Sequence, residues 1–169
     1  MSQKIIYFVC ALAVLLFAKL FPQAPNFSPA IALCLLSGWI FKEKSYAILL
    51  PLTAIIMTDL FMGYSSPLLY VAYAAICMAP KVYKKFSAFH GFITVVNGSF
   101  LFFLISNFGV WISTAMYAKT GAGLYQCYLM AMPFFRNTFS STLIYGVLFA
   151  AVCVAIKKLS LVKPAGRLS

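Results

Sequence analysis

Two charged side chains within long apolar segments are the residues of this sequence best suited to bind a polar molecule. Asp59 lies near the end of the apolar run 46–62, and Arg136 interrupts the run 124–158. A carboxylate at the centre of a bilayer costs about 2.5–3.5 kcal/mol, so an acid kept there is a candidate for function. Asp59 and Arg136 could orient the polar ends of a ligand. They could instead pair with each other, which would lower the burial cost of both.

Amide, hydroxyl and aromatic side chains accompany these charges. Asn107 lies four residues before Trp111, so the two would share one face of a helix. An amide at membrane depth needs a partner, either in the protein or in a ligand. We expect Asn107 to hydrogen-bond a small molecule and Trp111, with Tyr125 or Tyr128, to stack on its ring. Each aromatic side chain could instead be an interfacial anchor. The predicted binding residues are Asn26, Ser28, Asp59, Asn107, Trp111, Tyr125, Tyr128, Arg136 and Asn137.

The sequence lacks the residue patterns of common enzymes. No second acid lies near Asp59, and neither an HExxH nor a GxSxG motif is present. His90 is the single histidine, and the five cysteines are scattered without a CxxC pair. There is also no GxxxxGK[ST] phosphate loop, so the chain cannot hydrolyse ATP by itself. We therefore expect no catalysis, no metal site and no cofactor.

Composition indicates the elements that must position these side chains. Of the 169 residues, 64% are apolar and 9% are charged, whereas charged residues make up about a quarter of a soluble domain. A net charge of +11 could mark a nucleic-acid binder, but the long apolar runs favour an all-α membrane protein. We expect one transmembrane domain over 1–158 and a short basic cytoplasmic tail over 159–169. The domain would be a bundle of six helices over about 5–21, 29–41, 46–62, 68–80, 88–113 and 124–158.

The distribution of positive charge predicts the orientation of this bundle. If the N-terminus is cytoplasmic and the chain crosses six times, ten of the 13 Lys and Arg residues lie inside. Only Lys19, Lys119 and Arg136 then lie outside. This bias follows the positive-inside rule and requires both termini to be cytoplasmic.

Two of the six segments are too short to cross a bilayer alone. The thirteen residues of 29–41 cover about 20 Å of a hydrocarbon core about 30 Å thick, and 68–80 is equally short. Ser28 and Pro29 favour a helix start at that point, so the residues before them must dip below the outer surface. Irregular backbone at membrane depth is tolerated where it lines a wet cavity. The sequence therefore predicts an outward-facing cavity, with local thinning of the bilayer as the alternative.

Five short motifs resemble those of a family of uncharacterised bacterial integral membrane proteins. That family is itself similar to the substrate-binding S components of energy-coupling factor transporters. The likeness extends over about 25–145. The motifs are Pro25-Asn-Phe-Ser-Pro29, Asp59-Leu-Phe-Met-Gly63, Asn107-Phe-Gly-Val-Trp111, Gly123-Leu-Tyr-Gln-Cys-Tyr128 and Pro133-Phe-Phe-Arg-Asn-Thr138.

The resemblance implies a function as well as a fold. S components are six-helix proteins that capture vitamins or metal ions from the outer side and dock on a transmembrane coupling protein with two ATPase subunits. Many carry an Ala-x-x-x-Ala docking pattern in the first helix, which 5–21 lacks, although the small residues Ala30, Cys34 and Gly38 could substitute. Metal-binding members have a His-rich N-terminus, which is absent here.

The resemblance therefore implies an S component in the bacterial inner membrane that takes up a vitamin-like, ring-containing nutrient. Its partners would be that small molecule, membrane lipids and a coupling protein with its two ATPase subunits, but no nucleic acid. The alternative is a membrane scaffold or assembly protein in which the same polar side chains hold the bundle together.

Overall fold

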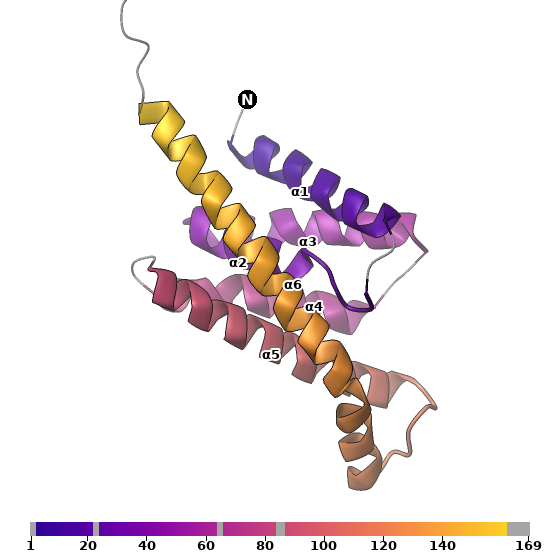
Figure 1. Cartoon of the computed structure of the whole chain (residues 1–169). Helices are drawn as coiled ribbons and strands as arrows, with labels where there is room; N and C mark the ends of the chain where they lie inside the picture. The colour runs from indigo at the N-terminus through magenta and orange to yellow at the C-terminus, as the bar shows by residue number, and fades with distance from the viewer. Residues whose placement is uncertain (1–2, 22–23, 64–65, 84–86, 162–169) are drawn as a thin grey trace, which may run out of the picture.

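The chain folds into six helices in a computed structural model that describes residues 3–21, 24–63, 66–83 and 87–161 (Figure 1). Two of the positive charges predicted to lie inside, Lys84 and Lys85, and most of the predicted tail 159–169 lie outside the described residues. Within the described ranges there is no β-strand, and each predicted apolar segment forms one helix, which confirms the all-α prediction. The elements are α1 (Gln3–Leu20), α2 (Ala30–Ile40), α3 (Lys44–Phe61), α4 (Pro67–Met78), the 3₁₀ helix η1 (Ala79–Val82), α5 (Ala88–Ser113) and α6 (Gly121–Leu161).

Three of the helices are long and apolar enough to span a bilayer, namely α3, α5 and the Gly121–Ala155 part of α6. The apolar parts of α1, α2 and α4 with η1 are shorter. Large apolar side chains cover the outside of the bundle; Phe61 and Phe89 are 73% and 69% exposed. An apolar surface of this extent is typical of a protein that meets lipid or a partner. The helices and this surface together indicate a membrane protein.

The short helix α2 forms the centre of the bundle. It contacts α3, α4, α5 and α6, and eight of its eleven residues, Ala30–Leu35 with Ser37 and Gly38, are buried. A helix that is apolar on all sides is expected in such a buried position. Ser28 helps to start α2, because its Oγ accepts a hydrogen bond from Ala30 N–H at 3.3 Å.

Close backbone approach seats α2 against α4. A Cβ atom added to Gly38 would lie 2.4 Å from Cys77 O and 2.8 Å from Pro80 Cγ. Only a residue without a side chain fits at such a distance, so Gly38 sets the spacing of these helices.

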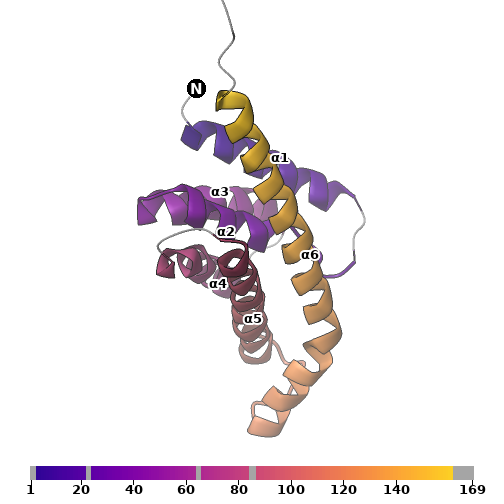
Figure 2. The ribbon, with the colours of Figure 1, turned by 60° about the vertical axis from the view of Figure 1, so that its left-hand side comes forward.

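Helix α6 forms one continuous helix, as predicted, although Pro133 and Arg136 interrupt its apolar run. A proline inside a helix removes one hydrogen bond and bends the axis without ending the helix when its surroundings support both halves. Figure 1 shows such a change of direction in α6, which crosses the other helices obliquely in Figures 1 and 2.

The helix ends separate into two groups (Figure 1). The start of α1, the start of α5 and the end of α6 lie on the left of that view, whereas the end of α1, the end of α5 and the start of α6 lie on the right. We call the second group the outer end, after the side on which the distribution of positive charge predicts it to lie. It includes residues 24–29, 61–63 and 114–120.

Candidate functional site

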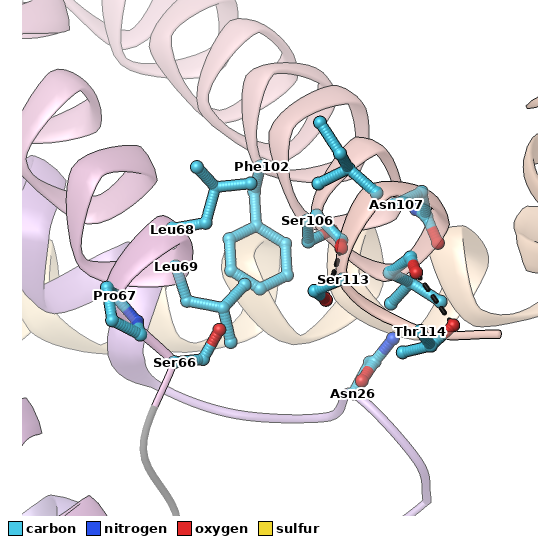
Figure 3. Close-up of a pocket in the computed structure, with 13 residues that line it drawn as sticks. Asn26, Ser66, Pro67, Leu68, Leu69, Phe102, Ser106, Asn107, Ser113 and Thr114 are labelled. Atoms are coloured by element: carbon cyan, nitrogen blue, oxygen red, sulfur yellow. Dashed lines mark hydrogen bonds between the residues drawn. The ribbon is translucent and has the colours of Figure 1, made fainter. Parts of the chain in front are cut away.

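A cavity of about 560 Å³ opens at the outer end between α4 and α5 (Figure 3). Small-molecule pockets in proteins have volumes of about 300–1,000 Å³, so this cavity is within the usual range. One wall is the start of α4, and the other is the second half of α5. The segment 24–29 contributes Asn26. The lining residues are Asn26, Ser66, Pro67, Leu68, Leu69, Phe102, Ser106, Asn107, Gly109, Val110, Ile112, Ser113 and Thr114.

Asn26 occupies a special backbone position at the mouth of this cavity. Its φ of +62° lies in the left-handed region, which asparagine tolerates better than most residues. Next to it, Phe27 N–H donates a 2.9 Å hydrogen bond to Ala24 O, and Asn137 Nδ2 donates one of 3.0 Å to Pro25 O. Helix α6 thus holds the turn from which Asn26 reaches toward Thr114 (Figure 3).

The α5 wall carries a row of hydroxyl groups that are already used as donors. Ser113 Oγ donates to Gly109 O at 2.6 Å, Thr114 Oγ1 to Val110 O at 2.8 Å, and Ser106 Oγ to Phe103 O at 3.4 Å. A hydroxyl has one hydrogen and two acceptor lone pairs. These three groups therefore face the cavity as acceptors.

Asn107 completes the α5 wall. Its Nδ2 donates a 2.8 Å hydrogen bond to Phe103 O. A carbonyl oxygen can only accept, so this bond fixes which end of the amide faces the helix. The side-chain oxygen of Asn107 and its second N–H group remain for another partner.

Gly109 controls the distance between the two walls. A Cβ atom at this position would lie 2.8 Å from Leu68 Cδ2 on α4. The glycine within the motif Asn107–Trp111 thus allows the start of α4 to lie against α5 at the cavity.

The DUF6580 family, described as a family of unknown function, matches residues 1–163 of the chain. The chain belongs to this family. Its resemblance to an uncharacterised family is therefore confirmed. No curated protein and no solved structure matches it.

The aromatic residues of the motifs lie outside the cavity in this DUF6580 protein. Trp111 Nε1 donates to Ala118 O at 2.9 Å, and Lys119 Nζ lies 5.6 Å from the centre of the Trp111 ring. Tyr128 OH donates to Leu104 O at 2.7 Å, while Tyr125 is 70% exposed. In this arrangement Trp111 connects α5 to the α5–α6 turn, and Tyr128 connects α6 to α5. Their stacking on a ligand stays a prediction.

Asp59 is paired with Lys19 and not with Arg136, the partner considered from the sequence. Its Oδ1 accepts a hydrogen bond from Lys19 Nζ, which joins α3 to α1 at the outer end. Both side chains are mostly buried, with 24% of Lys19 and 18% of Asp59 exposed. Arg136 is exposed on α6 and forms no such pair with Asp59. Neither Asp59 nor Arg136 lines the cavity.

Of the nine predicted binding residues of the DUF6580 chain, the cavity contains Asn26 and Asn107. Asn137 and Ser28 support it indirectly, through the turn before α2 and the start of that helix. Sequence reasoning missed Ser106, Ser113 and Thr114. Ser113 and Thr114 lie seven and eight residues after Ser106, and residues two helical turns apart share one face of a helix. The spacing could therefore have placed these three hydroxyl groups on one face.

A larger groove of about 940 Å³ lies between α2, α5 and α6 toward the opposite end. Its lining is almost wholly apolar, and the hydroxyl of Thr94 within it donates to Gly91 O at 2.8 Å. A polar ligand would find few partners there. In the described parts of the chain no three His, Cys, Asp or Glu side chains form a group that could hold a metal ion.

Proposed function

We propose that this protein is a six-span membrane protein of the bacterial inner membrane that captures a small nutrient from the outer side, as the S component of an energy-coupling factor transporter does. The observation that carries the proposal is the outer-end cavity. It has the volume of a small-molecule pocket, and polar groups from three separate segments converge on it. Asn26 and Asn107 belong to two of the motifs on which the resemblance rests.

In this proposal the protein binds and a partner supplies the energy. Both termini would lie in the cytoplasm, and a transmembrane coupling protein with two ATPase subunits would drive release to the inside. Lipid chains would cover the apolar surface and fill the groove between α2, α5 and α6. The protein itself would catalyse no reaction and would hold no cofactor.

Native mass spectrometry of the purified protein tests whether the cavity binds a molecule. We expect a small molecule to co-purify with the wild type, and to be lost in Ser106→Phe, whose added ring would fill the cavity. The control is Leu104→Phe on the same helix, outside the cavity lining and 37% exposed, which should retain the molecule. If nothing co-purifies and no vitamin raises the melting temperature, the proposal is wrong.

A scaffold function is the second candidate, and specific contacts favour it. The polar groups of Asn137, Tyr128 and Trp111 bond to backbone carbonyls of the protein. The bond from Tyr128 on α6 to Leu104 O on α5 joins two helices, and interhelical bonds of this kind stabilise membrane bundles. A scaffold would show no retained molecule and would co-purify with the same membrane complex in wild type and Ser106→Phe.

A further inference from the structure

The hydrogen-bonding pattern of the outer-end cavity restricts the chemistry of its ligand. We infer that the ligand is an uncharged molecule that carries at least two N–H or O–H donors along one edge. This inference rests on the proposed binding function and adds the class of substrate.

The claim that the ligand is uncharged rests on the lack of charged side chains among the described lining residues. None of the thirteen lining residues is Asp, Glu, Lys, Arg or His. The carboxylate of Asp59 lies outside the lining and is neutralised by Lys19. Moving an ionised group from water into an apolar site without a counter-charge is very costly. The ammonium group of Lys119 lies outside the lining and is bonded to the backbone carbonyls of Trp111 and Thr114. A ligand carboxylate or ammonium group would therefore meet no opposite charge among the described lining residues.

The orientation of the α5 hydroxyls carries the second half of the inference. Ser106, Ser113 and Thr114 each donate their single hydrogen to a carbonyl of α5, so toward the cavity they can only accept. The Oδ1 atom of Asn107 is a fourth acceptor on the same wall, and the second N–H group of this amide is a donor beside it. An N–H or O–H group buried against this wall is satisfied while each hydroxyl keeps its present bond, whereas a ligand carbonyl facing these hydroxyls would require one of them to give up its bond to α5. Thr114 Oγ1 offers one remaining lone pair, because it also accepts a 3.3 Å hydrogen bond from Met116 N–H.

The opposite side of the cavity can donate. The amide of Asn26 and the hydroxyl of Ser66 lie there (Figure 3), and Pro67 has no N–H group. Apolar side chains fill the rest of the lining, among them Phe102, Leu68 and Leu69. The cavity therefore fits a flat apolar body with donors on the edge that faces α5 and an acceptor toward Asn26.

Mass spectrometry can identify the chemical class of the bound molecule even when the compound itself is unknown. Purified protein is incubated with a metabolite extract of bacterial cells, and the retained molecules are released and analysed by mass spectrometry in H₂O and D₂O. The mass shift in D₂O counts the exchangeable N–H and O–H hydrogens, and electrophoretic mobility gives the charge. We expect a neutral molecule with two or more exchangeable hydrogens.

Two matched pairs of variants place the contacts on the α5 wall. Thr114→Val and Ser113→Ala should each weaken retention about two- to tenfold, which is the value of one hydrogen bond. Thr53→Val is the control for the first, because Thr53 Oγ1 also donates to the carbonyl four residues earlier but is exposed on α3. Ser45→Ala, exposed at the start of α3, is the control for the second. Both controls should bind like the wild type.

The outcomes separate this inference from the proposed function. Retention of a charged molecule, or of one with fewer than two exchangeable hydrogens, would overturn the inference and leave the binding function standing. Equal retention by Thr114→Val, Ser113→Ala and their controls would also overturn it. If the wild type retains nothing, the proposed function fails and the inference fails with it.

Discussion

At the scale of single residues, the pairing of Asp59 with Lys19 explains how an acid is kept in an apolar segment. The ammonium group of Lys19 supplies the counter-charge, and most of both side chains is shielded from solvent. Removal of one partner leaves the other charge unpaired in apolar surroundings, whereas removal of both leaves none. The pair therefore has a structural role that requires no ligand.

This role predicts a specific pattern in a double-mutant cycle. Asp59→Leu should lower the free energy of unfolding by about 1–3 kcal/mol, because it strands the Lys19 cation. The double variant Lys19→Met with Asp59→Leu should be more stable than Asp59→Leu alone. Thermal unfolding in detergent measures both effects. Additive losses from the two single changes would contradict the pairing.

The sequence alone could not identify the partner of Asp59. The cost of a buried charge marked Asp59 as important, but a cost does not identify a partner. Lys19 and Asp59 lie 40 positions apart, and only the packing of α1 on α3 brings them together. The same holds for Ser113 and Thr114. In the sequence they are two polar residues at the end of a helix, and only the position of α4 opposite them shows that they line a cavity.

At the scale of helices, the apolar runs were sufficient to predict all six elements. Charges, prolines and glycines separate the runs, and each run forms a helix because its backbone groups must bond internally at membrane depth. Helix α5 ends at Ser113, as predicted, but the contacts that satisfy its last carbonyls could not be inferred in this way. Lys119 Nζ donates to Trp111 O and Thr114 O, and thereby satisfies carbonyls that the end of the helix leaves open.

The turn between α5 and α6 depends on one glycine. A Cβ atom on Gly123 would lie 2.0 Å from Ala118 O, whereas one on Gly121 would meet nothing within 4 Å. We expect Gly123→Ala to lower the stability by about 1–3 kcal/mol or more, since backbone must move. Gly121→Ala is the control and should change the melting temperature little. Equal melting temperatures for the two variants would show that the turn is not packed as described.

The contact between α2 and α4 gives a second test at this scale. Gly38→Ala should destabilise the bundle, because the new Cβ would lie 2.4 Å from the carbonyl of Cys77. Gly146→Ala provides the comparison, as its Cβ would make an ordinary 3.7 Å contact with Val95 Cγ2. Thermal unfolding should separate the two variants clearly. If Gly38→Ala and Gly146→Ala had the same melting temperature, α2 and α4 would lie farther apart than described here.

At the scale of the whole molecule, sequence and structure support different parts of the account. The balance of positive charge predicts which side faces the cytoplasm, and the alternation of the helix ends in Figure 1 is compatible with it. The structure adds the cavity at the outer end and the polar groups that line it. The sequence predicted a cavity there from two short helices, but it could not select Asn26 and Asn107 from nine candidate residues.

The proposed topology makes a prediction that does not depend on any ligand. A membrane-impermeant thiol reagent added to intact cells should label Met116→Cys, in the exposed α5–α6 turn, above the background of the native cysteines. It should not label Lys42→Cys, which is exposed between α2 and α3 at the opposite end, until the membrane is permeabilised. Labelling of Lys42→Cys alone would show that the cavity opens to the cytoplasm.

The central claim is that the cavity between α4 and α5 holds the captured molecule. Its most direct test is an experimental structure of the purified protein with the retained molecule bound. If the cavity holds the molecule, ligand density should lie against Asn107, Ser113 and Thr114, with Asn26 covering it. Density in the apolar groove between α2, α5 and α6, with the outer-end cavity empty, would contradict the claim.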